Sequence, residues 1–268
     1  AVHKSPLAAP QWIAEQGLDC YEYQCGKGVH VGEDTARRVG ENARKHGISL
    51  SLHAPYFINL ANPDPDSLQK TIGYITSACL VASQMGASRV VIHSGALMKR
   101  TRREALDTAL RSLREVIRTC DGQGFGHIAL CPETMGKINQ LGNLDEVLIM
   151  CGVDERFIPC IDFGHLNART HGGLETYEDF EAVLNSIENA LGADRLKVYH
   201  SHFSKIQYTD GGEKCHLTFE DEQYGPDFDF LAELIYKKGL TPITVCESAG
   251  TQAEDALVMK KMYLEQKI

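Results

Sequence analysis

Short apolar runs of strand length alternate with longer amphipathic runs along almost the whole chain, and this order restricts the possible folds more than any other feature. The strand-like runs cover residues 19–25, 48–55, 89–95, 127–134, 158–165, 196–204 and 242–249. Apolar residues recur at helical spacing over 7–16, from 34 onward, and over 66–85, 103–120, 144–150, 177–191, 227–238 and 253–265. Strands and helices that follow one another in this way predict a parallel sheet covered by helices.

The number of repeats and the chain length favour a barrel. The chain has 268 residues, which is close to the size of a single (β/α)₈ barrel. Seven strands are expected, each followed by a helix, and one further helix over 7–16 precedes the first of them without a strand in front of it. We therefore predict an α/β TIM (β/α)₈ barrel whose first strand is missing from this chain. Because no linker or low-complexity tract interrupts the pattern, we expect one domain over residues 1–268.

Composition narrows the classes of protein that this chain can belong to. The chain has no run of about 18 apolar residues, so we expect no membrane span. Its first residues do not resemble a secretory signal. The nine cysteines are scattered without a CxxC pair, which indicates reduced thiols and a cytoplasmic location. The net charge of −9 has the wrong sign for a broad nucleic-acid-binding surface. An anionic substrate would therefore have to be attracted locally, by a metal or a small basic patch.

Ionisable side chains gather at the ends of six of the seven expected strands. They are His53, His93, Glu133, Asp162 with His165, His200 with His202, and Glu247. Active sites of α/β barrels lie at the carboxyl ends of the strands. Strand alternation also places Ser49, Ser51 and His53 on one face and the apolar neighbours on the other, so these ionisable residues should line the barrel.

Carboxylates and imidazoles that converge in a buried place are costly unless a cation binds them. Nitrogen and oxygen ligands together suit Zn²⁺, with Mn²⁺ or Fe²⁺ as the next choices. Seven or more ligands exceed the number that one tetrahedral ion uses, so at least two ions are expected. Neighbouring pairs of metal ions are typical of enzymes that cleave phosphoesters.

Seven sequence motifs together resemble the endonuclease IV family, the zinc-dependent AP endonucleases with a xylose isomerase-like barrel. The motifs are SLHAPYFINLANPD, VVIHSGA, PETMGKINQLG, PCIDFGHLNA, HSHFSK, GGEKCH and CES, in family order. The resemblance implies a site of up to three zinc ions that cleaves DNA on the 5′ side of abasic sites, as in base excision repair. Ligands carried over by the motifs are His53, His93, Glu133, Asp162, His165, His216 and Glu247. The implied catalytic carboxylates are Glu133, which bridges two ions, and Glu247, and the implied DNA-facing loop contains Tyr56 and Asn59.

Three departures from the family pattern leave open questions. In HSHFSK, Lys205 favours His200 as the ligand, whereas the strand pattern also allows His202. In EKCH, Glu213 and His216 are three apart instead of the family's two, so either the carboxylate is shifted or this metal loses a ligand. The loop over residues 23–31 has Lys27 as its only cation and lacks the arginine-rich stretch that the endonucleases insert into DNA. The metal site is therefore better supported than DNA as its substrate.

Two other functions are compatible with the sequence, and several residues could have a purely structural role. The same barrel serves sugar isomerases and epimerases, which use one or two divalent metals and two carboxylates for proton transfer, here Glu133 and Glu247. A non-catalytic barrel that binds nucleic acid or metal is the third hypothesis. Arg100, Arg102 and Arg103 either hold phosphate or form a solvated helix start. We expect a monomer, with Cys131, Cys160 and Cys246 as apolar filling.

Overall fold

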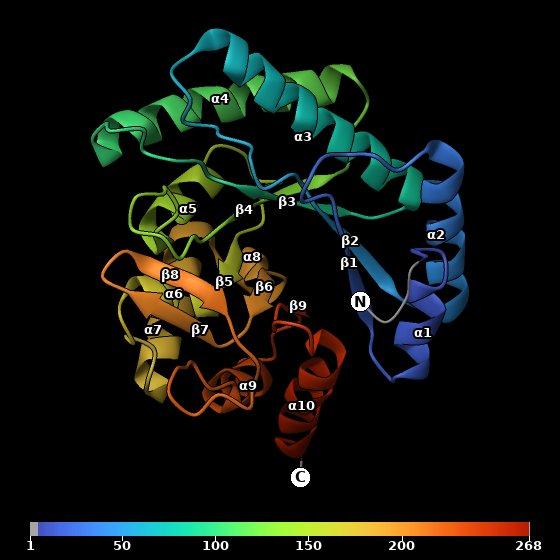
Figure 1. The fold of residues 1–268 in the computed structure, drawn as a ribbon, viewed down its shortest axis with the longest axis vertical. Helices are drawn as coiled ribbons and strands as arrows, with labels where there is room; N and C mark the ends of the chain where they lie inside the picture. Colours follow the sequence, from blue (N-terminus) through green and yellow to red (C-terminus); the bar gives the residue numbers. More distant parts are fainter. Residues whose placement is uncertain (1–4, 268) are drawn as a thin grey trace.

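Seven parallel strands form one sheet that curves into an almost closed barrel in the computed structural model, which describes residues 5–267 (Figure 1). In the order in which they pair, the strands are β1 (Cys20–Gln24), β2 (Ser49–His53), β3 (Arg89–His93), β4 (Ala129–Glu133), β5 (Cys160–Asp162), β6 (His200–Phe203) and β9 (Ile243–Cys246). The order along the sheet follows the order along the chain, as the strand and helix pattern predicts.

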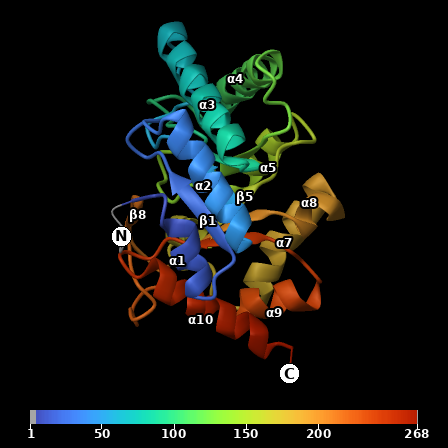
Figure 2. The same cartoon turned by 90° about the vertical axis from the view of Figure 1, so that its right-hand side faces the viewer.

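Helices cover the outside of this sheet (Figures 1 and 2). They are α1 (Ala9–Glu15), α2 (Glu33–His46), α3 (Pro65–Met85), α4 (Arg102–Gly122), α5 (Leu144–Cys151), α6 (Phe163–Arg169), α7 (Tyr177–Leu191), α8 (Ala193–Lys197), α9 (Asp229–Lys237) and α10 (Gln252–Glu265). Local signals define several ends. Asp64 accepts a hydrogen bond from the backbone of Ser67 at the start of α3, and Thr101 forms a capping box with Glu104 at the start of α4.

The pairing register brings candidate residues side by side at one end of the barrel. Gln24 on β1 is level with His53 on β2, His93 on β3 with Glu133 on β4, and Asp162 on β5 with His202 on β6. All of these lie at or near the carboxyl ends of their strands. Leu50 and Leu52 pack into the apolar core outside the sheet, while Ser51 and His53 are buried on its inner face. The alternation read from the sequence therefore holds on β2.

The sheet is not closed by hydrogen bonds between its two end strands. Within residues 5–267, no strand pairs with the outer edge of β1 or of β9. A cavity of about 1090 Å³ lies there, lined by residues of β1, β9, α1 and α10. Lys260 of α10 reaches the carbonyl of Gly17 at 2.7 Å and the carboxylate of Asp19 at 2.5 Å. The expected barrel that lacks its first strand is confirmed.

Several elements differ from the sequence-based predictions. The predicted strand 158–165 ends at Asp162, because that side chain caps α6 by accepting from the His165 backbone at 2.6 Å. The predicted strand 196–204 begins only at His200, since the short helix α8 occupies its first residues. An antiparallel hairpin after β6 was not predicted as a hairpin; it consists of β7 (Ile206–Thr209) and β8 (Gly212–His216). Its turn contains Asp210-Gly211, which is a strong hairpin signal.

No helix within residues 5–267 combines the length and the apolar character that crossing a bilayer requires.

Candidate metal centre

The first group of donors comes from the ends of β2, β3 and β4. The Nε2 atoms of His53 and His93 lie 3.2 and 3.3 Å from the same oxygen, Oε2 of Glu133. The Nδ1 atom of His53 lies 2.7 Å from the carbonyl of Ala54, and that of His93 lies 3.2 Å from the carbonyl of Tyr56. A carbonyl only accepts, so each Nδ1 carries the hydrogen. Each Nε2 can then offer its lone pair to a cation beside Glu133.

The second group lies at the centre of the barrel mouth and consists of Glu133, Asp162, His202 and Glu247. Their nearest donor atoms all lie within 4.8 Å of one another. The Nδ1 atom of His202 is 3.1 Å from Oε1 of Glu133 and 3.5 Å from Oε1 of Glu247. Because Glu133 turns Oε2 to the first group and Oε1 to the second, its carboxylate lies between the two groups. This is the bridging position that the family resemblance implies.

The third group combines His165 of α6 with Glu213 and His216 of the hairpin. His165 donates from Nδ1 to the carbonyl of Thr134 at 2.9 Å and turns Nε2 towards Oε2 of Glu213 at 3.4 Å. The Nδ1 atom of His216 lies 2.8 Å from the hydroxyl oxygen of Ser204. A side chain at position 136 could not fit, since a Cβ there would be 2.6 Å from Glu213 and 2.9 Å from His165. Glycine at this position allows the group to form.

A β-bulge explains the unusual spacing of Glu213 and His216. In the hairpin, Tyr208 is paired with Glu213 but Gln207 is paired with Cys215, so Lys214 has no partner of its own. One extra residue reverses the alternation of side chains beyond it, so residues three apart share a face as residues two apart do in a regular strand. Of the two interpretations left open by the sequence, this geometry supports a shifted carboxylate rather than a lost ligand.

The carboxylates of the centre are neutralised by protonated histidines rather than by lysine or arginine. Burial raises the pKa of the Glu133 carboxyl, but the nearby imidazoles of His202, His165 and His53 outweigh it and hold the pKa well below its usual range. Burial lowers the pKa of His165, whereas Asp162 and Glu133 together raise it to about 10. Burial raises the pKa of Asp162. Protons on histidines therefore occupy the place where a cation would neutralise the same carboxylates.

The donor chemistry fits a metal centre. Oδ2 of Asp162 is buried and has no hydrogen-bond partner within residues 5–267, although it lies 3.2 Å from Nδ1 of His165. An unpaired, buried carboxylate oxygen that faces other donors is what a cation would satisfy. Imidazole nitrogen and carboxylate oxygen suit zinc, manganese or iron. The first two groups share Glu133 and the third adjoins them through His165, so they form one continuous centre rather than three separate sites.

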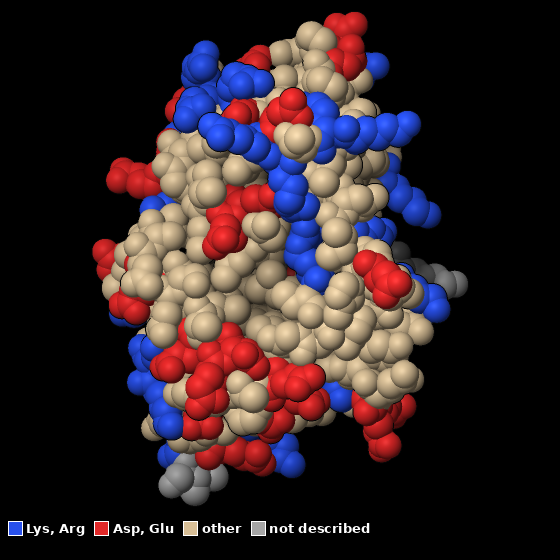
Figure 3. All heavy atoms as spheres, turned by 90° about the vertical axis from the view of Figure 1, so that its left-hand side faces the viewer, with Lys and Arg blue, Asp and Glu red and all other residues tan. Residues whose placement is uncertain are grey.

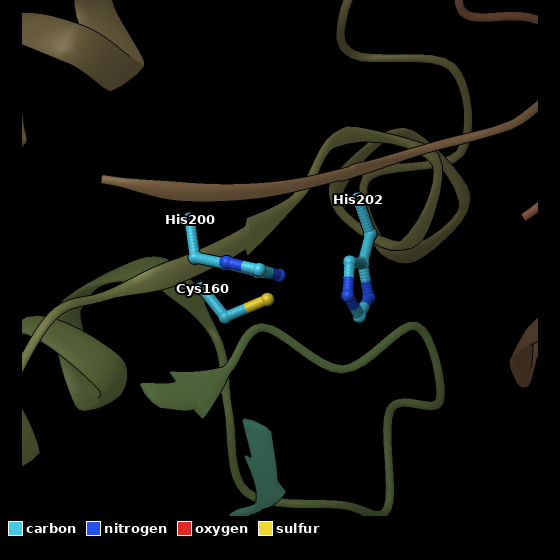
Figure 4. A group of neighbouring side chains, drawn as sticks. All are labelled: Cys160, His200 and His202. Atoms are coloured by element: carbon cyan, nitrogen blue, oxygen red, sulfur yellow. The ribbon is translucent and has the colours of Figure 1, made fainter. Parts of the chain in front are cut away.

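His200 lies deeper in the barrel than the three groups. Its Nε2 is 2.9 Å from Oε2 of Glu22, and its side chain belongs to a different cluster, with Cys160 and His202 (Figure 4). Lys205, which had favoured His200 as the ligand, donates to the carbonyl of Asp221 at 2.7 Å and pairs with Asp227. The geometry thus favours His202 over His200 at the mouth.

Glu22 was not among the residues expected from the sequence. It is buried on β1, where Ser51 donates to its Oε2 at 2.8 Å and His202 Nε2 lies 3.0 Å from its Oε1. A signal existed, because a glutamate in the middle of an otherwise strand-like run shares the inward face with Cys20 and Gln24. Most of the expected ligands lie at the carboxyl ends of strands or beyond them, whereas Glu22 lies in the middle of β1.

Tyr56 and Asn59, the expected substrate contacts, differ in their surroundings. Tyr56 stands at the rim with 51% of its surface exposed, and its ring stacks on His93 with centroids 5.5 Å apart. The side-chain oxygen of Asn59 accepts from the backbone of Ala61 and Ala96 at 3.0 and 3.1 Å. Asn59 therefore links two loops, while Tyr56 presents an exposed aromatic surface beside the donors.

The arginine run after β3 is only partly available to a ligand. Arg102 binds Glu146 and the carbonyls of Ile138 and Gln140, and Arg100 donates to the carbonyl of Ala61. Figure 3 shows that most basic side chains of one face lie in its upper part, with some acidic ones among them, and that a cluster of acidic side chains lies below a central hollow. The excess negative charge of the chain is thus unevenly distributed on this face.

Two comparisons of sequence agree with this architecture. Residues 10–262 match the family model described as a xylose isomerase-like TIM barrel. An uncharacterized protein of Methanocaldococcus jannaschii is 29% identical over 92% of this chain and 88% of its own. A protein of Bacillus licheniformis named probable endonuclease 4 is 36% identical over 74% of this chain and 68% of its own.

Solved structures of two kinds share the fold. A D-tagatose 3-epimerase-like protein superposes with a TM-score of 0.75 at 20% identity, over 98% of this chain and 94% of that one. Endonuclease IV from Thermus thermophilus superposes with a TM-score of 0.69 at 18% identity, over 99% and 96%. At these identities the likeness is one of fold alone.

Proposed function

The chain belongs to the xylose isomerase-like TIM barrel family, and we propose that it is a metal-dependent phosphodiesterase of the endonuclease IV type that cleaves DNA on the 5′ side of abasic sites. The relatives named probable endonuclease 4 support an action on DNA. We propose base excision repair as its role, in one barrel domain that acts as a monomer. All nine cysteines are free, which fits the reducing conditions of a cytoplasmic location.

One observation carries this proposal: the mouth contains three groups of donors rather than one. The central group alone would hold a single ion, as an isomerase or epimerase needs. The flanking groups add His53 with His93 on one side, and His165 with Glu213 and His216 on the other. Since four of these five side chains are imidazoles whose second nitrogen is held by a carbonyl or a hydroxyl, the flanking groups are built as ligands rather than as isolated polar residues.

The proposed ligands divide among three ions. His53, His93 and Glu133 would hold the first, Glu133, Asp162, His202 and Glu247 the second, and His165, Glu213 and His216 the third. Zinc ions bound there would activate water and neutralise the charge of the phosphodiester.

The remaining chemistry depends on the residues of the chain. Glu133 is 1% exposed and so is shielded from bulk water, while the side chain of Glu247 is 17% exposed and can meet a substrate. The exposed ring of Tyr56 offers an aromatic surface to a base or a deoxyribose, because stacking on such rings is a common way to hold unpaired nucleotides. Its hydroxyl donates to Gln24 at 2.9 Å, which holds the ring at the rim.

The test combines metal analysis with a cleavage assay. Elemental analysis of the purified protein should find close to three ions per chain, and a duplex with one abasic site should be cut on its 5′ side. Prolonged chelation should abolish cleavage, and added zinc should restore it. Cleavage by protein shown to be free of metal would rule out the mechanism.

A sugar epimerase or isomerase is the second candidate. The central group contains two glutamates that could transfer protons at carbon, and the fold resembles that of a D-tagatose 3-epimerase-like protein. This candidate predicts one or two ions per chain and turnover of ketoses, with no cleavage of abasic duplex. Assays of both substrate classes on the same metal-loaded sample separate the two.

A further inference from the structure

A buried layer of polar side chains lies beneath the central donor group. It contains Glu22 of β1, Ser51 of β2, and His200 and His202 of β6, none of which is more than 5% exposed. Ser51 and His200 both approach Oε2 of Glu22, at 2.8 and 2.9 Å, and His202 Nε2 lies 3.0 Å from Oε1. One oxygen of the Glu22 carboxylate therefore contacts Ser51 and His200, and the other lies beside His202.

His202 differs from the other donor histidines in the group that faces its second ring nitrogen. Each donor histidine of the flanking groups holds its second nitrogen against a carbonyl or hydroxyl oxygen, namely that of Ala54, Tyr56, Thr134 or Ser204. The Nδ1 atom of His165 also lies 3.2 Å from Oδ2 of Asp162. His202 turns Nδ1 to Glu133 and Glu247. Its buried Nε2 lies 3.0 Å from Oε1 of Glu22 and makes no hydrogen bond within residues 5–267.

We propose that Glu22 is a positioning residue for the metal centre: it keeps the hydrogen of His202 on Nε2 and so leaves the lone pair of Nδ1 for the central ion. A carboxylate behind a ligating imidazole fixes the ring, selects the tautomer and makes the imidazole a stronger donor. This inference rests on the metal centre of the proposed function, but it does not depend on which substrate that centre acts on.

The rest of the layer holds Glu22 in place. Ser51 donates its hydroxyl hydrogen to Oε2, and His200, two residues before His202 on β6, approaches the same oxygen. With Oε2 engaged twice, Oε1 lies 3.0 Å from His202 Nε2 and also accepts from Gln24 at 3.4 Å. His200 thus has an indirect part in the centre, because it acts through Glu22 and His202 rather than at the proposed ion.

The contacts of the neighbouring thiol and of His200 argue against a separate metal site in this layer. Cys160 lies close to His200 and His202, and Figure 4 shows its sulfur beside the His200 ring and on the side that faces His202. However, Cys160 also packs with Val91 and Cys131 in an apolar cluster inside the barrel. Nε2 of His200 already faces Glu22, which leaves only its Nδ1, a buried nitrogen without a hydrogen-bond partner in residues 5–267, to join the thiol in binding an ion.

The test measures metal affinity rather than activity. In Glu22→Gln the amide retains the shape of the side chain but not its charge, and we expect the ion of the central group to bind about 10 to 100 times more weakly, with the other ions unchanged. Zinc titration by calorimetry against a competing chelator measures each ion in turn. Glu22→Asp keeps the charge and should restore part of the affinity. Tyr23→Phe, on the same strand but at the next, oppositely directed position, is the matched control and should bind zinc as the wild type does.

A second variant and a spectroscopic signal distinguish a specific loss of metal affinity from a general folding defect. Ser51→Ala removes one of the two contacts to Oε2 while leaving Glu22 in place, so it should weaken the same ion severalfold. In zinc-loaded wild-type protein, ¹⁵N-histidine NMR should show the His202 hydrogen on Nε2, and in Glu22→Gln that hydrogen should exchange faster with water.

Three results would overturn the assignment. If Glu22→Gln and Ser51→Ala both bind every ion as tightly as the wild type, Glu22 has only a structural role, and the proposed function stands. A fourth ion bound through the Cys160 thiol would mean that Nε2 of His202 is itself a ligand. If the wild type binds no zinc, the proposed function fails together with this inference.

Discussion

Two buried glutamates at the mouth of the barrel, Glu133 and Glu146, have opposite surroundings. Glu146, in the first turn of α5, accepts from Arg102 at 2.6 and 2.7 Å and from the backbone of Gly142 and Asn143 at 2.8 and 3.1 Å. Glu133, at the end of β4, faces two further carboxylates and several histidines, and it has no arginine or lysine among the ion pairs of the described residues.

The different partners of the two glutamates distinguish a carboxylate with a structural role from one that can bind a metal ion. A permanently charged guanidinium and two amides satisfy Glu146 completely, so nothing further needs to bind there. Imidazoles satisfy Glu133 only while they hold protons, and the same arrangement is satisfied better by a divalent cation. Burial of a carboxylate therefore does not indicate a metal site unless its partners are themselves potential ligands. Substitutions around the two glutamates should accordingly affect metal binding to very different extents.

Glu133→Gln should have the largest effect. It removes the carboxylate that two groups share, so we expect two ions to be lost at micromolar zinc and cleavage to fall by more than about 100-fold, since changes next to a metal already cost up to that factor. Metal content by elemental analysis and single-turnover cleavage measure the two effects. Retention of three ions by a folded variant would show that Glu133 does not bridge.

Deletion of Lys214 should leave the third ion bound. Without the bulged residue Glu213 and His216 are two apart, so regular alternation keeps them on the same face, and we expect the affinity for the third ion to change by less than about 10-fold. The control is Lys214→Ala, which keeps the bulge and should also bind three ions. Loss of the third ion from a folded deletion variant would show that the bulge does not explain the spacing of these two residues.

Acidity should weaken metal binding gradually. The pKa of His165 is raised to about 10 in the metal-free protein, so this histidine is protonated at neutral pH and an ion must displace the proton. Affinity should rise by up to about tenfold per pH unit for each proton released, as pH increases towards 10. Calorimetry in buffers of different ionisation enthalpy counts these protons. An affinity that does not change between pH 6 and 8 would contradict the assignment of His165 as a ligand.

The stability of the metal-free protein should respond in the opposite direction. A histidine whose pKa is raised on folding contributes stability that is fully present below about pH 6.5, its unfolded value, and is lost as pH rises through about 10. Urea unfolding of the metal-free protein at several pH values should show this decline, and saturating zinc should remove the contribution of His165 to it.

Glu146→Gln should leave metal binding unchanged. It breaks a charged hydrogen-bond pair with Arg102, whose side chain is 35% exposed, so we expect the free energy of unfolding to fall by about 1–3 kcal/mol. Urea unfolding measures the loss, and elemental analysis should still find the wild-type number of ions. A lower metal count would mean that the two glutamates are not as different as their contacts indicate.

Much of the architecture and of the centre was predictable from the chain alone. The strand and helix order predicts a parallel barrel, and the carboxyl ends of parallel strands meet at one mouth, which is why His53, His93, Glu133, Asp162 and Glu247 converge as expected. The boundaries were less predictable: the residues after Asp162 continue an apolar run, yet its side chain caps a helix there. The end of β5 is set by a local hydrogen bond, which the pattern of apolar residues does not predict.

The order of the elements and the face on which each strand residue lies follow from the sequence, because helical and strand periodicities are properties of neighbouring residues. Three features required the folded chain: the depth at which each histidine of β6 lies, the bulge that turns Glu213 to the centre, and the contact of Glu22 with His202. Two of them depend on distances between segments far apart in sequence, such as β1 and β6, which are 178 positions apart at Glu22 and His200. Periodicity says which way a side chain points, but only packing of the whole barrel decides what it meets.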